Sequence, residues 1–481
     1  MRRTPLLTPA LLAVTTMLAG GLVACSSTKA GSSNAGKPAS APASLPGCDK
    51  VACSGEIAGA PYAIRLPASW NGTLLLWSHG YRQARPSPPD FTPVDRKPEA
   101  VPNGNEELAT RLLAQGYALA GSAYASNGWA VPDGVKADQD LYRFFRDKVG
   151  KPQRVYAWGD SLGGLITETL SETHPDWLSA AAPRCGVLAG SNRTLDLALD
   201  AAYAIRTLLI PDLKLSNYSS YEEAVGNFDK VLATLKKAPS DIKGTAAKLL
   251  LVAAIADPSR KTQSEDGHDL ISRLTAELTV IGTAAGYGTF GRWEIEQRVH
   301  GNPSTNDTST YAPRVDAEER ALINQLAPGQ VDGWIAQLEA GKRVSADPAA
   351  RQAADGLGNP QGDPTVPTLT LHTEYDDLVP VQEEAVFAAA VAKNNATEKV
   401  LQLYTAPPAT YPARNGQTGG APYGAGHCNF SMDESLATVR LLDGWARSGT
   451  KPDTATTRAA FTGSTGLDLG YSPKPWPVTT R

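Results

Sequence analysis

The chain has 481 residues, of which 42% are hydrophobic, so it can bury a large core either as one big domain with an insertion or as two to three smaller domains. Its formal net charge is only −4, and no dense cluster of Lys and Arg stands out along the sequence. These values describe a globular protein and argue against nucleic acid as a partner.

The first 24 residues predict an export signal. Two N-terminal arginines precede an apolar stretch, residues 6–23, which is too short and too interrupted for a permanent membrane span. The stretch ends in Leu22-Val23-Ala24-Cys25, which resembles the bacterial lipobox, whose Cys is lipidated before cleavage. We therefore expect residues 1–24 to be a lipoprotein signal peptide and Cys25 to anchor an extracytoplasmic protein to the cell membrane or cell surface. An ordinary secretory signal with a chance Cys is the alternative.

Residues 25–47 consist mostly of Ser, Ala, Gly, Pro and Lys and contain no aromatic residue. Such a segment cannot bury enough apolar surface to fold, so it predicts a flexible tether. Residues 31–37 match the start of a phosphate-binding loop, but Pro38 stands where Ser or Thr would bind Mg²⁺, and no strand precedes it. We therefore predict no nucleotide site here.

From residue 54 onward, β-rich apolar runs alternate with amphipathic helical runs, which is typical of a mostly parallel sheet covered by helices. In the first half we expect strands at residues 62–66, 73–78, 117–122, 154–158 and 179–184, and helices at 106–115, 138–149 and 163–173. The pattern resumes with strands at 368–372 and 399–404 and helices at 381–392 and 433–447. Residues 48–189 and 366–450 together therefore predict one α/β domain.

Residues 190–365 have helical periodicity, for example at 221–237 and 317–326, and few β-branched runs, so we interpret them as a helical insertion. Within it, residues 286–291 have the glycine spacing of a dinucleotide fingerprint but follow helix-like sequence, so we expect a glycine-rich bend. Residues 451–481 are polar with prolines, and we expect this C-terminal tail to pack loosely on the surface.

Beyond the lipobox the chain has four cysteines, at positions 48, 53, 185 and 428. An even number in an oxidising compartment favours two disulfides. Cys48 and Cys53 would close a short loop where the folded part begins, which leaves Cys185 to pair with Cys428. Free buried thiols are the alternative. The cysteines and histidines lack the spacing of zinc ligands, so no metal site and no cofactor are predicted.

The most informative segment is residues 155–164, an expected strand that leads into G-x-S-x-G-G and then into a helix. The pattern alone is weak in a glycine-rich chain, but it lies at the strand-to-helix junction that a nucleophile elbow requires. Gly159 and Gly163 would permit the strained turn, and Ser161 Oγ would project above the sheet. We therefore predict that Ser161 is a nucleophile; a tight turn that holds a Ser by coincidence is the alternative.

A serine hydroxyl needs a base to take its proton, and that base is usually an imidazole. Residues 423–430 are the only segment with a His after the last expected strand, which makes His427 the predicted base. Residues 376–380 follow the penultimate strand and resemble the D-x-x-V-P segment whose Asp orients the imidazole, which identifies Asp376. Asp377 and Glu374 remain alternatives, because the sequence does not fix this alignment to the residue.

The oxyanion of a tetrahedral intermediate needs two backbone N–H donors. Leu162, directly after the nucleophile, would supply one of them. Residues 77–81 resemble the His-Gly loop of serine hydrolases, which makes the N–H of Tyr81 the second donor and gives His79 the role of bracing the loop.

These ordered motifs resemble the α/β-hydrolase superfamily over residues 54–189 and 366–448, and residues 190–365 resemble the cap domains inserted after its sixth strand. The resemblance implies an α/β-hydrolase fold, with a mostly parallel central sheet flanked by helices and an inserted, mainly helical cap. It also implies an acyl-enzyme mechanism on a small-molecule ester or peptide. Carboxylic esters are favoured; a secreted serine aminopeptidase of the same fold and a non-catalytic binding lipoprotein are the alternatives.

The neighbouring His427 and Cys428 also resemble feruloyl esterases and tannases, but those enzymes carry a Cys directly before the nucleophile, where this chain has Asp160. Their substrate is therefore not transferred to this protein. In the cap, we expect Tyr287, Trp293 and Trp334 to form walls of the substrate pocket.

Overall fold

The structure is a computed structural model, and it describes residues 52–477 except for residues 89, 174, 257–269 and 408–424. The predicted signal peptide, the tether, Cys25 and Cys48 lie outside the described residues. The predicted pairing of Cys48 with Cys53 therefore stays a prediction.

The centre of the molecule is a nine-stranded sheet with the order β1-β2-β4-β3-β5-β6-β7-β8-β9. Its strands are β1 (Ala52–Ile57), β2 (Ala60–Arg65), β3 (Thr73–Ser78), β4 (Ala118–Ser122), β5 (Arg154–Asp160), β6 (Ala180–Arg184), β7 (Thr368–Thr373), β8 (Val400–Thr405) and β9 (Leu467–Asp468). The pairings from β4 to β8 are parallel, and those at the two edges are antiparallel. The carboxyl ends of the parallel strands therefore meet along one edge, where ligands bind in open α/β sheets.

Both faces of this sheet are buried, because apolar side chains alternate along β3 and pack on two different cores. Leu75 and Trp77 belong to the core under α2 (Glu106–Ala114) and α14 (Met432–Ser448). Leu74 and Leu76 belong to the core under α3 (Val131–Phe144). The remaining helices beside the sheet are α4 (Leu162–Glu172) and α13 (Glu383–Lys393).

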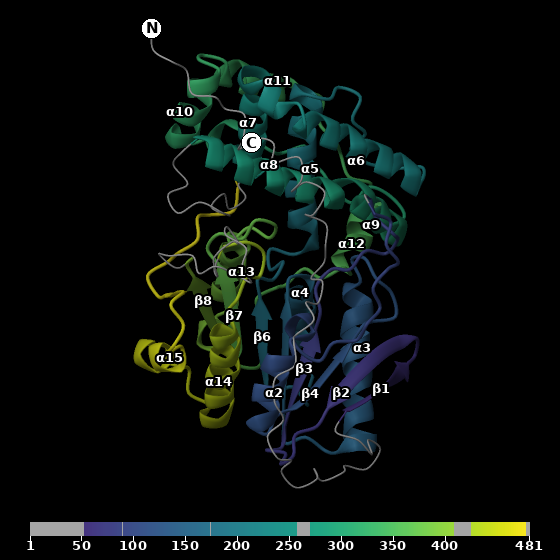
Figure 1. The fold of residues 1–481 in the computed structure, drawn as a ribbon, viewed down its shortest axis with the longest axis vertical. Coiled ribbons are helices and arrows are strands. Elements are labelled where there is room, and N and C mark those ends of the chain that lie inside the picture. The colour runs from purple at the N-terminus through teal and green to yellow at the C-terminus, as the bar shows by residue number, and fades with distance from the viewer. Residues whose placement is uncertain (1–51, 89, 174, 257–269, 408–424, 478–481) are drawn as a thin grey trace, which may run out of the picture.

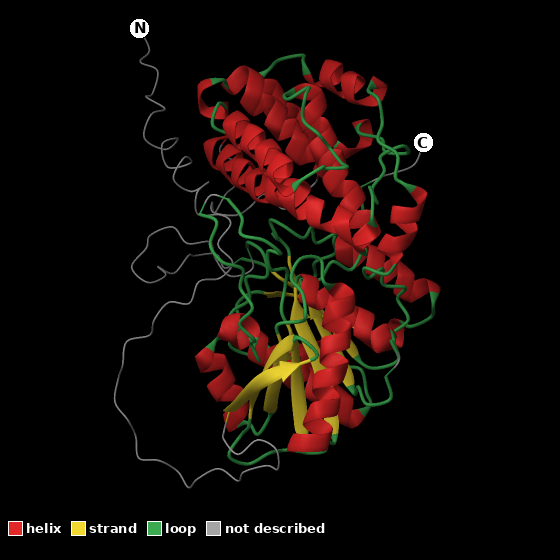
Figure 2. Cartoon of the chain, turned by 90° about the vertical axis from the view of Figure 1, so that its right-hand side faces the viewer, coloured by secondary structure: helices red, strands yellow, loops and turns green. Residues whose placement is uncertain are grey.

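Among the described residues between β6 and β7, eight α-helices form a cap above the carboxyl ends of the strands, as Figures 1 and 2 show. They are α5 (Ser191–Leu208), α6 (Tyr221–Leu235), α7 (Ala247–Ala256), α8 (Leu270–Gly286), α9 (Arg292–Val299), α10 (Ala317–Leu326), α11 (Val331–Ala340) and α12 (Pro348–Asp355). The cap has a core of its own, which includes Tyr203, Phe228 and Leu250. This sheet order with a helical insertion after β6 is the α/β-hydrolase fold.

Several elements differ from the sequence-based expectation. Helix α3 begins seven residues earlier than expected, at Val131, with Pro132 in its first turn, where the missing N–H of proline costs no hydrogen bond. The expected glycine-rich bend is wrong: Tyr287–Gly291 forms a π-helical turn that joins α8 to α9 without a break. Strand β1 was not predicted, because its side chains are mostly exposed and carry no apolar pattern.

The expectation of a loosely packed C-terminal tail is wrong, because the tail completes the sheet. It contributes α15 (Thr454–Ala460) and the edge strand β9, which pairs antiparallel with β8. Phe461 follows α15 and is only 2% exposed in the core beneath α14. Leu467 and Leu469 of the tail pack against the same core. The sequence did not predict this packing, because prolines and polar residues separate these apolar side chains.

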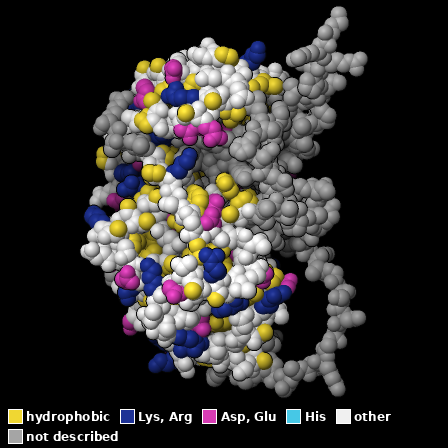
Figure 3. All heavy atoms as spheres, turned by 90° about the vertical axis from the view of Figure 1, so that its left-hand side faces the viewer, with side chains coloured by type: hydrophobic (Ala, Val, Ile, Leu, Met, Phe, Trp, Pro, Cys, Tyr) yellow, Lys and Arg dark blue, Asp and Glu magenta, His cyan; other side chains and the backbone are white. Residues whose placement is uncertain are grey.

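On the face that Figure 3 shows, acidic and basic side chains are interspersed rather than separated by sign. Among the described residues, no helix combines the length and the apolar character that crossing a membrane requires.

We expect Phe461→Ala to destabilise the protein by about 3–4 kcal/mol, because it leaves a cavity in the core shared with the sheet. Denaturant unfolding would measure this loss. Phe91→Ala is the matched control, since Phe91 is 52% exposed, and it should change stability by less than about 0.5 kcal/mol. Equal effects of the two substitutions would show that the tail is not anchored through Phe461.

Candidate active site

Ser161 lies at the turn between β5 and α4, above the carboxyl edge of the sheet. Its φ of 62° and ψ of −125° are strained for a residue with a side chain, and its N–H donates to the carbonyl of Arg184 at 3.0 Å. The neighbouring glycines are required by space: a Cβ on Gly159 would lie 2.4 Å from the carbonyl oxygen of Gly163, and one on Gly163 would lie 2.1 Å from that of Ser78. The turn therefore holds the hydroxyl in the geometry of a nucleophile elbow.

The structure brings His427 and Asp376 to this hydroxyl. Nε2 of His427 lies 2.8 Å from Ser161 Oγ, while its Nδ1 lies 2.9 and 3.0 Å from the two carboxylate oxygens of Asp376. Asp376 is fully buried, and it also accepts hydrogen bonds from the backbone N–H groups of Leu378 and Val379 at 2.9 and 2.8 Å. The carboxylate is thus fixed in position against the imidazole.

The two alternative acids take other positions. Asp377 lines the cavity in front of Ser161, and burial and the charge of Asp376 raise its pKa to about 6. Glu374 is buried beside the end of β7. Of the three candidates, Asp376 is the one whose carboxylate contacts the ring of His427.

The protonation of this pair follows from its surroundings. Burial alone would raise the pKa of Asp376, but the charge of His427 and the hydrogen bonds to the carboxylate outweigh it and lower that pKa. Burial alone would lower the pKa of His427, but the charges of Asp376, Asp377 and Asp160 outweigh it and raise that pKa. Asp376 is therefore ionised when His427 takes a proton.

Behind Asp376 lies a second histidine that the sequence analysis did not single out. His372 on β7 is fully buried, and its Nε2 donates to the carbonyl of Val379 at 3.0 Å and lies 3.8 Å from Asp376. Its Nδ1 lies 3.5 Å from a carboxylate oxygen of Glu384. Burial lowers the pKa of His372, but these two carboxylates raise it more. A His within a strand that otherwise consists of Thr and Leu was the available signal.

A buried ion pair supports the other side of the elbow. Arg184 on β6 is 1% exposed and donates to both carboxylate oxygens of Asp160 at 2.7 and 2.9 Å. Its guanidinium also lies over the rings of Trp158 and Phe430, at 5.2 and 4.9 Å from their centroids. Since Asp160 directly precedes Ser161, this pair fixes the backbone at the nucleophile. The sequence signal was a single Arg at the end of an alanine-rich strand.

The predicted disulfide between Cys185 and Cys428 is present and links positions 243 residues apart. Cys185 follows β6, and Cys428 follows His427, so the bond ties the loop of the histidine to the sheet. The backbone N–H of Cys428 also donates to Asp376 at 3.2 Å, and that of Gly426 donates to the carbonyl of Tyr375 at 2.8 Å. The loop is thus held on both sides of His427.

Leu162 and Tyr81, whose N–H groups are the predicted oxyanion donors, line the same cavity as Ser161. Leu162 is the first residue of α4, where a backbone N–H has no acceptor within the helix. The loop of Tyr81 approaches closely, since a Cβ on Gly80 would lie 3.2 Å from that of Ser161. Burial and the charge of Arg82 lower the pKa of His79 to about 3, so its ring is neutral, and its Nδ1 lies 2.7 Å from the carbonyl of Gly80. His79 therefore braces this loop.

A largely apolar cavity opens in front of Ser161 and extends into the cap, with a volume of about 1440 Å³ when its solvent-open part is included. Of the three predicted wall residues, Tyr287 lines it and packs edge-on against Tyr81. The other two predictions are wrong. Trp293 lies outside this lining, with Arg85 over its ring and Tyr221 edge-on to it, and Trp334 is buried in the core of the cap. Helical periodicity alone does not tell which face of a cap helix meets the cavity.

The geometry thus defines a serine at a nucleophile elbow in an α/β-hydrolase fold. No protein-family model matches the chain. It is 21% identical over 435 residues to an o-phthalyl amidase of Xanthobacter agilis. The alignment covers 82% of this chain and 87% of the amidase.

Among solved structures, an esterase from Aspergillus oryzae aligns with 13% identity over 82% of this chain and 78% of its own, at a TM-score of 0.36. A rice cell wall degrading esterase from Xanthomonas oryzae aligns with 14% identity over 72% of this chain and 78% of its own, at a TM-score of 0.33. Scores this low add nothing to the fold assignment, which rests on the strand order and the elbow.

The charge of Asp377 should influence the pH dependence of kcat/KM through the pKa of His427. If His427 acts as a base it must be neutral, so kcat/KM should rise with pH through the pKa of His427. Asp377→Asn removes one of the negative charges that raise this pKa, so the acidic limb of the profile should move to lower pH. Asp176→Asn, an exposed residue beyond the far end of α4, is the control. An unmoved limb in Asp377→Asn would contradict the assignment.

Proposed function

We propose that this protein is a serine hydrolase that cleaves carboxylic esters through an acyl-enzyme. The observation that supports this most directly is the continuous contact from Ser161 Oγ through the imidazole of His427 to the carboxylate of Asp376. Such an arrangement activates a hydroxyl that is otherwise a weak nucleophile.

In the proposed reaction, His427 Nε2 takes the proton of Ser161 as Oγ attacks the carbonyl carbon. The N–H groups of Leu162 and Tyr81 stabilise the oxyanion, and His427 then gives its proton to the leaving alcohol. A water molecule, deprotonated by the same imidazole, releases the acid and restores the hydroxyl. Asp376 orients His427 throughout and stabilises its charged form.

The cavity favours esters over the N-terminal amines of peptides. Its lining is dominated by aliphatic side chains, and the one acidic residue among its described lining, Asp377, belongs to the hydrolase domain rather than the cap. The described part of the cap lining therefore offers a positively charged amine no acidic residue to bind. Amide hydrolysis is the second candidate, because the curated relative is an amidase with matching length.

We further propose that the protein acts outside the cytoplasm, anchored through a lipid on Cys25. The lipobox-like residues 22–25 and the polar tether support this, and a disulfide beside the site suits an oxidising compartment.

Cys25→Ala should abolish incorporation of a labelled fatty acid and move the protein from the membrane fraction to the soluble fraction, because the residue that would carry the lipid is removed. Ser26→Ala, at the next position, is the control and should leave both unchanged. A Cys25→Ala protein that still sediments with membranes would contradict the lipid anchor.

Ser161→Ala should lower kcat by roughly 10⁴ or more and abolish labelling by a fluorophosphonate, while Asp376→Asn should be less severe. The assay pairs short p-nitrophenyl esters with aminoacyl p-nitroanilides. Ser448→Ala, an exposed serine at the end of α14, is the control. Cleavage of the anilides alone would favour amide hydrolysis. A wild-type protein that neither labels nor turns over either substrate would favour a binding lipoprotein.

A further inference from the structure

The cavity in front of Ser161 is elongated along two cap helices. On α5 its lining residues stand at positions 194, 195, 197, 198, 201, 202 and 205, which share one broad face of the helix, so this face borders the cavity from 194 to 205. On α8 the lining positions 280, 281, 284 and 285 form a second such face. A stripe on each of two helices defines a channel rather than a shallow pocket.

The two stripes begin at the catalytic end and continue into the cap. Leu195, near the start of α5, belongs to the same core cluster as Leu162 and Val187 beside the elbow, whereas Ile205 belongs to the core of the cap. On α8 it is the C-terminal end that lies near the catalytic end, because Tyr287, just after the helix, contacts Tyr81 of the oxyanion loop. The channel therefore leads from Ser161 away from the sheet.

Small side chains keep this channel open. Ala198, Ala201 and Ala202 of α5 line it and are only partly buried, although every one of them is apolar and lies inside the cap. Ala284 and Ala285 stand on the matching face of α8. Apolar surface left uncovered between packed helices is costly unless an apolar ligand covers it.

Several polar residues of the cap that line the channel already have partners within the protein. Lys214 Nζ is paired with both carboxylate oxygens of Glu223 at 3.0 and 2.8 Å, and Tyr218 donates its hydroxyl to the carbonyl of Lys214 at 2.8 Å. Thr289 donates to the carbonyl of Ala285 at 2.6 Å. The channel thus offers a substrate little hydrogen bonding beyond the region of Ser161.

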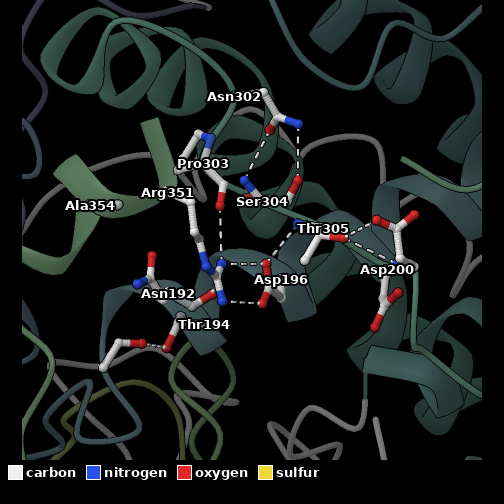
Figure 4. Close-up of polar contacts among 12 residues, drawn as sticks. Asn192, Thr194, Asp196, Asp200, Asn302, Pro303, Ser304, Thr305, Arg351 and Ala354 are labelled. Carbon is white, nitrogen blue, oxygen red and sulfur yellow. Dashed lines mark hydrogen bonds and ion pairs between the residues drawn. The ribbon is translucent and has the colours of Figure 1, made fainter. Parts of the chain in front are cut away.

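The base of α5 is fixed, so the channel is preformed at its catalytic end. Figure 4 shows Arg351 of α12 reaching Asp196 of α5, with two hydrogen bonds of 2.8 and 2.9 Å. Arg351 also donates to the carbonyl of Pro303 at 3.0 Å, and the N–H of Thr305 donates to Asp196 at 2.9 Å. A bidentate pair of this kind holds a helix in one orientation.

The length of the channel limits its ligand. The lining of α5 runs from Thr194 to Ile205, or about 16 Å at ~1.5 Å per residue. An extended chain advances roughly 1.1 to 1.2 Å per bond, since a peptide residue with three backbone bonds spans about 3.3 to 3.6 Å. The stripe therefore accommodates roughly thirteen to fifteen carbons of an unbranched chain.

We propose that this channel binds the acyl chain of the substrate, and that the protein prefers esters of long unbranched fatty acids, up to roughly thirteen to fifteen carbons. This inference rests on the proposed function, because it places the ester carbonyl at Ser161 and the chain along α5.

The test is the dependence of kcat/KM on acyl length, measured with p-nitrophenyl butyrate, octanoate and dodecanoate. The wild-type protein should prefer dodecanoate to butyrate by at least about ten-fold, since each methylene buried in an apolar pocket contributes to discrimination. A steady decline of kcat/KM from butyrate to dodecanoate would overturn the acyl channel. Absence of both ester turnover and fluorophosphonate labelling would instead overturn the proposed function.

Two substitutions on α5 test how far the acyl chain extends into the channel. Ala198 and Ala202 lie about 6 and 12 Å beyond Thr194 along the helix, which corresponds to roughly five and ten carbons. Ala198→Phe should therefore lower the octanoate-to-butyrate and dodecanoate-to-butyrate ratios by about ten-fold or more, whereas Ala202→Phe should lower only the second ratio to that extent. Thermal unfolding of each variant would show that the fold is retained, and the ratios do not depend on the active fraction.

Ala321→Phe, on an exposed position of α10, is the matched control and should leave both ratios unchanged. If all three variants retained the wild-type ratios, the acyl chain would not follow α5, and the proposal would be wrong even with full esterase activity. If Ala202→Phe lowered the octanoate ratio as much as Ala198→Phe, the chain would not lie along α5 in the proposed direction.

Discussion

The whole site depends on the position of one imidazole. The ring of His427 must meet Ser161 on one side and Asp376 on the other, yet these residues stand in three segments separated by the cap and by β8. A hydrogen bond tolerates only a few tenths of an ångström of displacement. The disulfide to Cys185 and the backbone bond from Cys428 to Asp376 supply the constraint that holds the ring in place.

The buried charges around the site support that constraint. Arg184 and Asp160 pair beneath the elbow, and His372 lies between Asp376 and Glu384. Removing one partner of a buried pair leaves an uncompensated charge at a cost of about 3–5 kcal/mol, so such groups are retained together. Their effect is to fix the backbone of the nucleophile on one side and the carboxylate on the other.

The cap adds what the sheet alone lacks, namely an apolar enclosure. Its helices bury their larger side chains in a separate core and turn small alanines toward the space above Ser161. The polar site lies on the sheet and the apolar channel lies in the cap. The sheet would therefore determine the proposed chemistry, and the cap the proposed acyl preference.

The sequence by itself determined the local features. A continuous apolar run predicted the bounds of β3, the glycines around Ser161 marked the elbow, and a position after the last long strand singled out His427. Only the tertiary structure decided between Asp376 and its neighbours, revealed His372 and Arg184 as supports, and showed that Tyr287 but not Trp334 faces the cavity. The physical reason is that periodicity and turn chemistry act between near neighbours, whereas contacts between distant segments depend on how whole elements pack.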